Sequence, residues 1–237
     1  LGVPVSMTND VNMMAQALNS RDPEHFGGTF AVIFIAHGIG MGLYINGRLF
    51  SGAFGSGAEF GHTNHQPGGP LCRCGRRGCV EAYAADYAIY RSVERLPPDE
   101  PPADIDPDAD MMAELEARAR GGEERVRAVY REAGLALGYG LSRLMGLVNP
   151  QRVVLTGRGV AAFDLMQEGF RAGIHEGLVA EIGHMTEIEV LSPEDDLVDV
   201  GILAGALQRL DREVFASSDH DPVPARKRSP MRAAANA

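Results

Sequence analysis

The side chains most suited to chemistry lie between residues 62 and 79. They are all three cysteines of the chain and two histidines just upstream of them, namely His62, His65, Cys72, Cys74 and Cys79. A Zn2+ ion takes four tetrahedral ligands from thiolate sulfur and imidazole nitrogen, so the spacing Cys-x-Cys-x4-Cys behind a histidine predicts a structural Cys3His zinc site. The spacing alone does not say which histidine binds. The alternatives are a redox pair, which would leave one thiol and the histidine unused, and three unrelated buried thiols.

A carboxylate near the start of the sequence is a second candidate for chemistry. Asp10 follows Asn9 and precedes apolar residues at positions 11, 14, 15 and 18, a spacing typical of one face of a helix. A polar residue at such a place is most simply a helix N-cap. A carboxylate held there beside a sugar could also accept a proton from a hydroxyl group, and the two roles are compatible because capping would fix the carboxylate in place.

Apolar patterns predict the elements that position these residues. Residues 30–36 are apolar without alternation, as expected of a strand buried on both faces. Asn46-Gly47 stands between two further apolar runs and signals a two-residue hairpin, so three antiparallel strands should lead into the zinc-binding segment. Other strands are expected at 1–5, 152–156 and 186–191, and helices at 10–18, 79–93, 123–147 and 197–210. The prolines and acids of 97–110 predict an exposed linker without chemistry.

Two glycine-rich stretches raise the possibility of a nucleotide site. Gly38 and Gly40 follow the first of these strands, and bare backbone N–H groups can converge on a phosphate. A tight turn between strands explains these glycines equally well. Gly157 follows the strand at 152–156, at the carboxyl end where open α/β sheets bind ligands. Arg158 comes next, and its side chain would crowd a ligand that lies against the backbone.

Composition limits the partners. The chain has 237 residues and a net charge of −10, which disfavours direct contact with a polyanion. No apolar run approaches the ~20 residues that span a bilayer. Nothing near the first residue resembles a signal peptide, and a reducing compartment would keep the thiols free for zinc. We therefore expect a cytoplasmic protein without membrane contact. A homo-oligomer, namely a dimer, is a separate expectation.

The metal-binding pattern is part of a longer motif, which runs from Gly61 to Glu81 and is more specific than the cysteine spacing. Gly61-His62, nine residues, and Cys72-x-Cys74-Gly75-x-x-Gly78-Cys79-x-Glu81 together resemble the signature of the ROK family, which groups repressors, uncharacterised reading frames and sugar kinases. The resemblance extends over residues 1–210. It implies an α/β fold of the actin-like (RNase H-like) ATPase type found in sugar kinases, mainly its second lobe. The implied division is 1–25 for the end of the first lobe, 26–215 for the second lobe with a zinc loop at 59–81, and 216–237 for a disordered tail.

The resemblance also implies roles for individual residues. The zinc ligands would be His62, Cys72, Cys74 and Cys79, which leaves His65 free of the metal. The residues that touch sugar hydroxyls would be Asn9, Asp10, Glu59, His62 and Glu81. In a kinase Asp10 would be the general base, ATP and Mg2+ would be cofactors, and the nucleotide contacts would be Gly38, Gly40 and Gly157. The implied small-molecule partner is a sugar or a sugar phosphate.

The sequence departs from the kinases of this family at three places. No Asp-x-Gly-x-Thr turn occurs, Ala36-His37 stands where a Gly-Thr pair is expected, and Arg158 replaces a glycine. These departures favour the sugar-sensing effector domain of a transcriptional regulator, which would reach DNA only through an N-terminal domain missing from this sequence. The alternative is a fragment of a zinc-containing, ATP-dependent hexose or N-acylhexosamine kinase. A third possibility is a truncated remnant without function.

Overall fold

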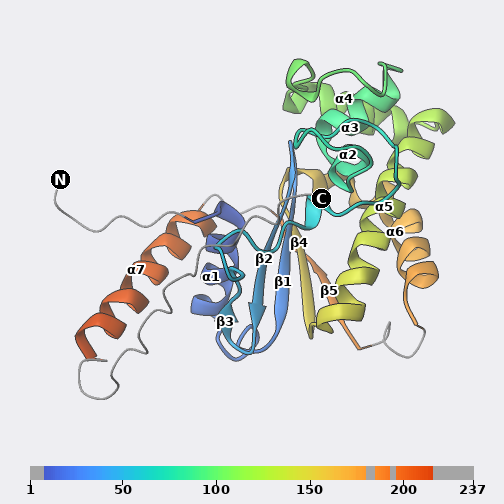
Figure 1. Ribbon diagram of the computed structural model, residues 1–237. Helices are drawn as coiled ribbons and strands as arrows, with labels where there is room; N and C mark the ends of the chain where they lie inside the picture. Colours follow the sequence, from blue (N-terminus) through green and yellow to red (C-terminus); the bar gives the residue numbers. More distant parts are fainter. Residues whose placement is uncertain (1–7, 180–184, 193–195, 216–237) are drawn as a thin grey trace, which may run out of the picture.

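The computed structural model describes residues 8–179, 185–192 and 196–215, and it is built on a mixed β-sheet (Figure 1). The five strands in these residues run in the order β3-β2-β1-β4-β5. Their bounds are β1 Phe30–Ile35, β2 Ile39–Ile45, β3 Arg48–Leu49, β4 Arg152–Thr156 and β5 Glu187–Val190. The strand expected at 1–5 and the tail expected from residue 216 lie outside the described residues.

The first three strands form the predicted antiparallel meander. β1 pairs antiparallel with β2, and β2 pairs antiparallel with β3. The hairpin turn has Asn46 at φ 52° and Gly47 at φ 73°, the left-handed pair that a tight two-residue hairpin requires. β4 and β5 add to the other side of β1 in parallel, so the sheet is mixed. The predicted α/β class is therefore confirmed.

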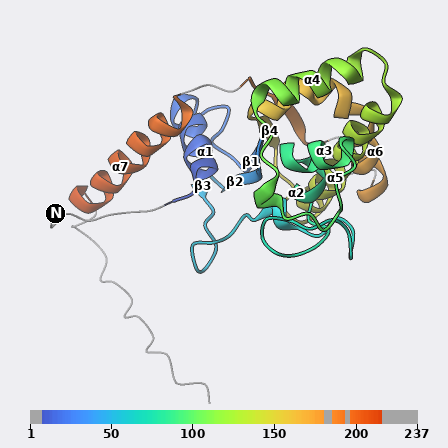
Figure 2. The same cartoon turned by 90° about the horizontal axis from the view of Figure 1, so that it is seen from above.

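Helices cover both faces of the sheet (Figures 1 and 2). α1 and α7 lie together on one face, and α3, α4, α5 and α6 lie on the other. Their bounds are α1 Asp10–Arg21, α2 Glu81–Ala84, α3 Asp86–Val93, α4 Ala109–Arg120, α5 Glu124–Val148, α6 Phe163–Gly177 and α7 Leu197–Phe215, with 3-10 turns η1 Phe60–His62, η2 Pro102–Asp104 and η3 Arg158–Ala162. Alternate residues of β1 enter the two cores, Phe30 and Val32 on the α1 side and Ile33 and Ile35 on the α5 side. This is why the strand shows no polar alternation.

The helices α5 and α6 pack with their backbones in contact. A Cβ added at Gly134 would lie 2.0 Å from the carbonyl oxygen of Met166, and one added at Gly169 would lie 1.9 Å from that of Arg131. No side chain larger than hydrogen fits at these places. The glycines of the two helices therefore set how closely α6 approaches the long helix.

Two expectations about the chain are wrong. The helix expected at 79–93 is broken at Ala85 (φ −77°, ψ 158°), because the N–H of Asp86 donates to Ala36 O at 3.0 Å, outside the helix. The segment 97–110 is not an exposed linker, since Pro102 and Ile105 are buried in it. It also starts the unpredicted helix α4, whose N-cap Asp108 accepts the Met111 N–H at 2.8 Å.

Candidate functional site

Four predicted metal ligands gather at one point of the zinc loop, residues 59–81. The ligand atoms of His62, Cys72, Cys74 and Cys79 all lie within 4.8 Å of one another. Cys74 Sγ is 3.7 Å from Cys79 Sγ, and Cys72 Sγ is 3.5 Å from His62 Nδ1. Zn–S bonds of ~2.3 Å and Zn–N bonds of ~2.0 Å in a tetrahedron put neighbouring ligand atoms roughly 3.5 to 3.8 Å apart. The composition of the cluster and these two distances therefore suit a zinc ion.

The surroundings of the thiols differ. Burial raises the pKa of Cys72, and the nearby charge of Glu81 adds to the shift. Burial also raises the pKa of Cys79. Burial opposes ionisation of Cys74 too, but hydrogen bonds from the Arg76 backbone and from the other two thiols lower its pKa overall. A bound cation has to displace protons from the two buried thiols.

Backbone turns give the zinc loop its shape. Leu71 and Arg77 form an isolated antiparallel bridge, and the Cys72 N–H donates to Arg76 O at 2.8 Å. Gly75 lies at the tip with φ 80°, in the left-handed region that favours glycine. Gly78 has φ 74°, and a Cβ there would lie 1.7 Å from Gln66 O. The two glycines therefore let the chain wrap tightly around the cluster.

His65 is outside the metal cluster and packs the loop against α5. Its ring centroid lies 4.8 Å from that of Tyr83 and 5.6 Å from that of Tyr139. Burial, followed by the charge of Arg143, lowers its pKa and favours the neutral ring. The Arg143 guanidinium also donates to Asn64 O at 2.9 Å. This histidine is thus a packing residue between the loop and the helix.

The elements that carry the predicted sugar residues meet at the start of β2. The Ile39 N–H donates to Glu81 Oε2 at 3.1 Å, which ties α2 to the strand. η1 touches the same residue, because a Cβ on Gly61 would lie 2.2 Å from Ile39 O. The first turn of α1 touches the next residue, where a Cβ on Gly40 would lie 2.6 Å from Val11 Cγ2. Segments far apart in the sequence therefore converge on two adjacent residues.

The polar side chains at this place differ in accessibility. Asn9, not Asp10, is the N-cap of α1, and Asn9 Oδ1 accepts the Val11 N–H at 2.7 Å. Asp10 Oδ1 accepts the same N–H at 2.8 Å, and both residues are exposed. Glu59 Oε2 lies 4.0 Å from His62 Nε2, so this ring faces the cysteines with one nitrogen and a carboxylate with the other. Glu81 is only 5% exposed.

The glycines proposed as nucleotide contacts have packing roles. Gly38 lies in the β1–β2 turn, residues 36–38, where a Cβ would be 3.3 Å from Glu81 Oε2. Gly40 is inside β2, facing α1. A Cβ on Gly157 would lie 2.5 Å from Ile35 O. The Arg158 side chain turns to the buried carboxylate of Asp86, with Nε at 2.7 Å from Oδ2.

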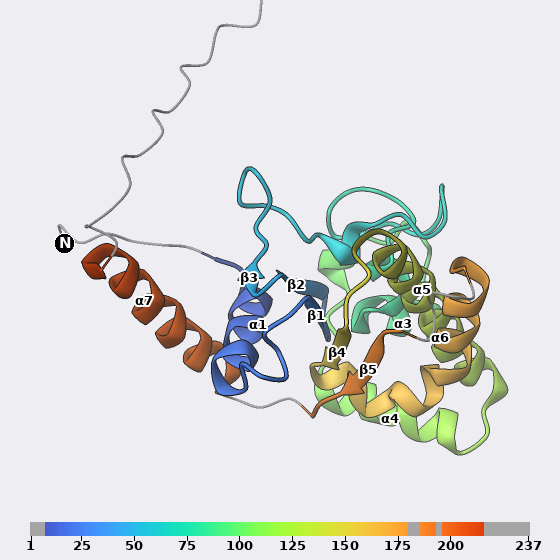
Figure 3. The same cartoon turned by 90° about the horizontal axis from the view of Figure 1, so that it is seen from below.

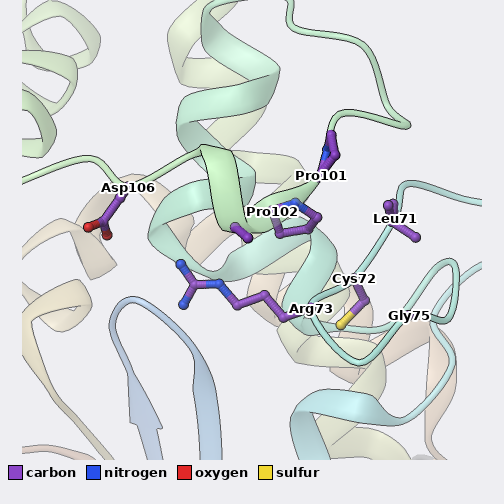
Figure 4. Close-up of a pocket in the computed structure, with 8 residues that line it drawn as sticks. Leu71, Cys72, Arg73, Gly75, Pro101, Pro102 and Asp106 are labelled. Carbon is purple, nitrogen blue, oxygen red and sulfur yellow. The ribbon is translucent and has the colours of Figure 1, made fainter.

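A hollow of about 540 Å3 opens beside the zinc loop (Figure 4). The residues that line it are Leu71, Cys72, Arg73, Gly75, Pro101, Pro102, Ala103 and Asp106. Cys72 is the only predicted site residue among them. Half of its wall comes from the segment expected to be a linker without chemistry. The sequence patterns did not predict Arg73 as a site residue either, although its position between two cysteines could have indicated it.

No helix in the described part of the chain combines the length and apolar character needed to cross a membrane.

Comparisons with known proteins give the family. The ROK family model matches residues 1–208. The xylose repressor of Bacillus subtilis (strain 168) is 27% identical over 186 residues, covering 78% of this chain and 46% of the repressor. The glucokinase of Streptomyces coelicolor is 31% identical over 192 residues, covering 76% of this chain and 59% of the glucokinase. The crystal structure of a ROK family glucokinase from Streptomyces griseus in complex with glucose and AMPPNP has a TM-score of 0.68 at 27% identity, covering 89% of this chain and 70% of that one.

The chain spans about half the length of the curated relatives it matches. Those relatives include both a repressor and a sugar kinase, so the likeness does not choose between the two activities. The mixed sheet with helices on both faces is the fold of the ROK sugar kinases, the predicted α/β actin-like ATPase fold. The family model covers most of the chain, and the relatives include both a repressor and a sugar kinase. The chain therefore belongs to the ROK family.

Proposed function

We propose that this chain is the sugar-binding effector domain of a ROK family transcriptional regulator, with Zn2+ held structurally by His62, Cys72, Cys74 and Cys79. The observation that favours a regulator is the hydrogen bond from the Ile39 N–H to Glu81 Oε2 at 3.1 Å. A phosphate cradle needs free backbone N–H groups that converge on an anion. Here the amide N–H that follows the β1–β2 turn, that of Ile39, already donates to the Glu81 carboxylate and is not free to bind a phosphate.

The ligand would be a neutral sugar or a sugar phosphate. Carboxylates suit a polyhydroxylated ligand because each oxygen accepts a charge-assisted hydrogen bond from a hydroxyl group. Asp10 and Glu59 are exposed and lie on elements that meet at the start of β2, while Asn9, His62 and Glu81 would complete the pocket. DNA would be bound by a part of the protein outside this chain. The reducing cytoplasm is part of the same proposal, since reduced thiols are needed for the metal. A homodimer is proposed as well.

Sugar binding is the direct test. Relatives of this chain are named as a xylose repressor, a glucokinase and an N-acetylmannosamine kinase, so D-xylose, D-glucose and N-acetyl-D-mannosamine are the probes. We expect titration calorimetry of zinc-loaded protein to detect at least one of them. Asp10→Asn and Glu59→Gln should each weaken that binding by about 10- to 100-fold, because a hydrogen bond to a charged group contributes ~1.5 to 3 kcal/mol.

Glu168→Gln is the matched control for these variants, because Glu168 is an exposed acid on α6, a helix that packs mainly on α5 and carries none of the predicted sugar residues. It should bind as the wild type does. Absence of binding to all three sugars would contradict the proposed function. Equal affinity of Asp10→Asn and wild type would contradict the proposed pocket.

The alternative function is an ATP-dependent sugar kinase, favoured by the 31% identity to a glucokinase. In that case Asp10 would be the general base, Gly38, Gly40 and Gly157 would contact the nucleotide, and ATP would bring Mg2+ as its cofactor. We expect no ADP release above background from this chain with ATP, Mg2+ and each of the three sugars. Phosphoryl transfer depends on holding the phosphates in line with the attacking hydroxyl, whereas a base alone contributes only about 10^2- to 10^4-fold.

A coupled ADP-release assay checks this expectation, with Asp10→Asn as its control. Sugar-dependent turnover by the wild-type chain that disappears in Asp10→Asn would establish the kinase and refute the regulator.

A further inference from the structure

Arg73 lies between two cysteines of the zinc loop, yet its side chain points away from the Cys72 sulfur (Figure 4). Arg73 Nη1 donates to the carbonyl oxygen of His37 at 2.7 Å. The same guanidinium covers the ring of Tyr87, with Cζ 4.7 Å from the ring centroid. One exposed side chain of the zinc loop thus reaches both the β1–β2 turn and a fully buried tyrosine.

Tyr87 in turn lies against the carboxylate of Glu81. Its hydroxyl donates to Glu81 Oε1 at 3.5 Å, the Cys72 thiol lies at the same distance from that oxygen, and the tyrosine is 0% exposed. The other oxygen of Glu81 accepts the N–H of Ile39. The carboxylate therefore makes its shortest hydrogen bond to the strand that follows the turn, while Cys72 and the tyrosine under Arg73 lie against its other oxygen.

The backbone is bound on both sides of Gly38, the last residue of the turn. Before Gly38, the carbonyl of His37 is bound by Arg73, and after it, the N–H of Ile39 is bound by Glu81. Gly38 has no side chain to restrict its backbone. The turn is also braced by the Ala36 N–H donating to Gly38 O and the Asp86 N–H donating to Ala36 O, both at 3.0 Å. Loss of the Arg73 contact would therefore loosen the turn at His37, between these anchors and Ile39, and make the placement of Glu81 less well fixed.

We propose that Arg73 is a positioning residue, which couples the zinc loop to the β1–β2 turn and thereby holds Glu81 in the sugar pocket. The inference rests on the proposed function and adds to it. Zinc folds the loop, the loop places Arg73, and Arg73 fixes the turn that orients Glu81. Sugar affinity then depends on the metal through this route as well as through His62 and through the contact of Cys72 with Glu81.

The test compares Arg73→Ala and Arg73→Lys with Arg76→Ala. Arg76 is exposed in the same loop, and its side chain makes no hydrogen bond or ion pair with the residues that the structure describes. The first readout is hydrogen exchange of residues 36–41 in zinc-loaded, sugar-free protein, followed by mass spectrometry. We expect about 10-fold faster exchange in Arg73→Ala, because local opening exposes the amides. Arg76→Ala should match the wild type. Arg73→Lys should be intermediate, since lysine can donate to His37 O but stacks less well on Tyr87.

The second readout is the dissociation constant for whichever of D-xylose, D-glucose and N-acetyl-D-mannosamine the wild type binds most tightly. Arg73→Ala should raise it about 10-fold while keeping one zinc per chain, and Arg73→Lys should restore part of the affinity. Unchanged exchange, unchanged affinity or loss of the zinc in Arg73→Ala would each overturn the inference. If the wild type binds none of these sugars, the proposed function is wrong, and the exchange of residues 36–41 alone decides whether Arg73 holds the turn.

Discussion

Removal of zinc by a chelator is expected to lower the melting temperature of this protein by about 10 °C or more. The reason lies in what the metal cluster supports. Cys72 and Cys79 are each 1% exposed. They share a small core with Ala82 and Tyr83 of α2 and with Ala136 of α5. Without a cation no metal–ligand bond joins the three thiols and His62, so the loop loses the interaction that closes it. Its packing on α5 should be lost with it.

The two histidines of the loop provide a matched pair for this prediction. His62→Ala removes a ligand and should abolish stoichiometric zinc, whereas His65→Ala removes only a ring packed on Tyr83 and should keep one zinc per chain. Elemental analysis and thermal melts of both variants are the measurements. Protein purified without chelator that contains no zinc, or that melts at the same temperature after chelation, would contradict the zinc assignment.

Gly134→Ala should destabilise the protein by about 3 kcal/mol, although it adds a single methyl group to an ordinary helix position. That methyl carbon would lie 2.0 Å from Met166 O, which belongs to the backbone of α6 and cannot turn aside as a side chain could. The two helices must move apart, and overpacking of this kind costs about 1 to 3 kcal/mol or more. The loss should appear as a lower midpoint of urea unfolding.

Gly146→Ala is the control in the same helix. A Cβ there would have its nearest neighbour, Leu178 Cδ1, at 3.8 Å, which is ordinary van der Waals contact. Replacing a helical glycine by alanine without a clash should stabilise the protein by about 0.5 to 1 kcal/mol. The same substitution is therefore expected to act with opposite signs 12 residues apart in α5. Destabilisation of equal size in both variants would show that helix packing is not the cause.

Features decided by local sequence were predictable. The long apolar stripe placed α5 within one residue at either end, at 124–148 against an expected 123–147. Asn149 ends it in the left-handed conformation at φ 49°. The unbroken apolar run of β1 and the Asn46-Gly47 turn predicted the antiparallel meander of β1, β2 and β3. The grouping of one histidine with three cysteines was expected as well, because the likeness to the family chose His62 over His65.

Features decided by contacts between distant segments were not predictable. The helix break at Ala85 depends on the bond from Asp86 to Ala36, which no local pattern reveals. The role of Glu81 as a buried partner of Ile39 depends on how β2 meets the zinc loop. The burial of Pro102 and Ile105 depends on the helices they touch, so a proline-rich composition was misleading. Which residues beyond the loop complete the pocket remained a prediction for the same reason.

The zinc loop and the sheet differ in how much of the chain each needs. His62 and Cys72 are only 10 residues apart, and Cys74 and Cys79 only 5, so closing the loop costs little entropy. The Thr29 N–H beside β1 is bound by Gln151, 122 residues later, and Gln16 of α1 is bound by Gln208 of α7, 192 residues later. Figure 3 shows the segment between β3 and the zinc loop standing away from the sheet. During synthesis the metal loop can therefore close while β1 still lacks β4. In that interval the nascent chain exposes an unpaired apolar strand edge, the state most open to aggregation.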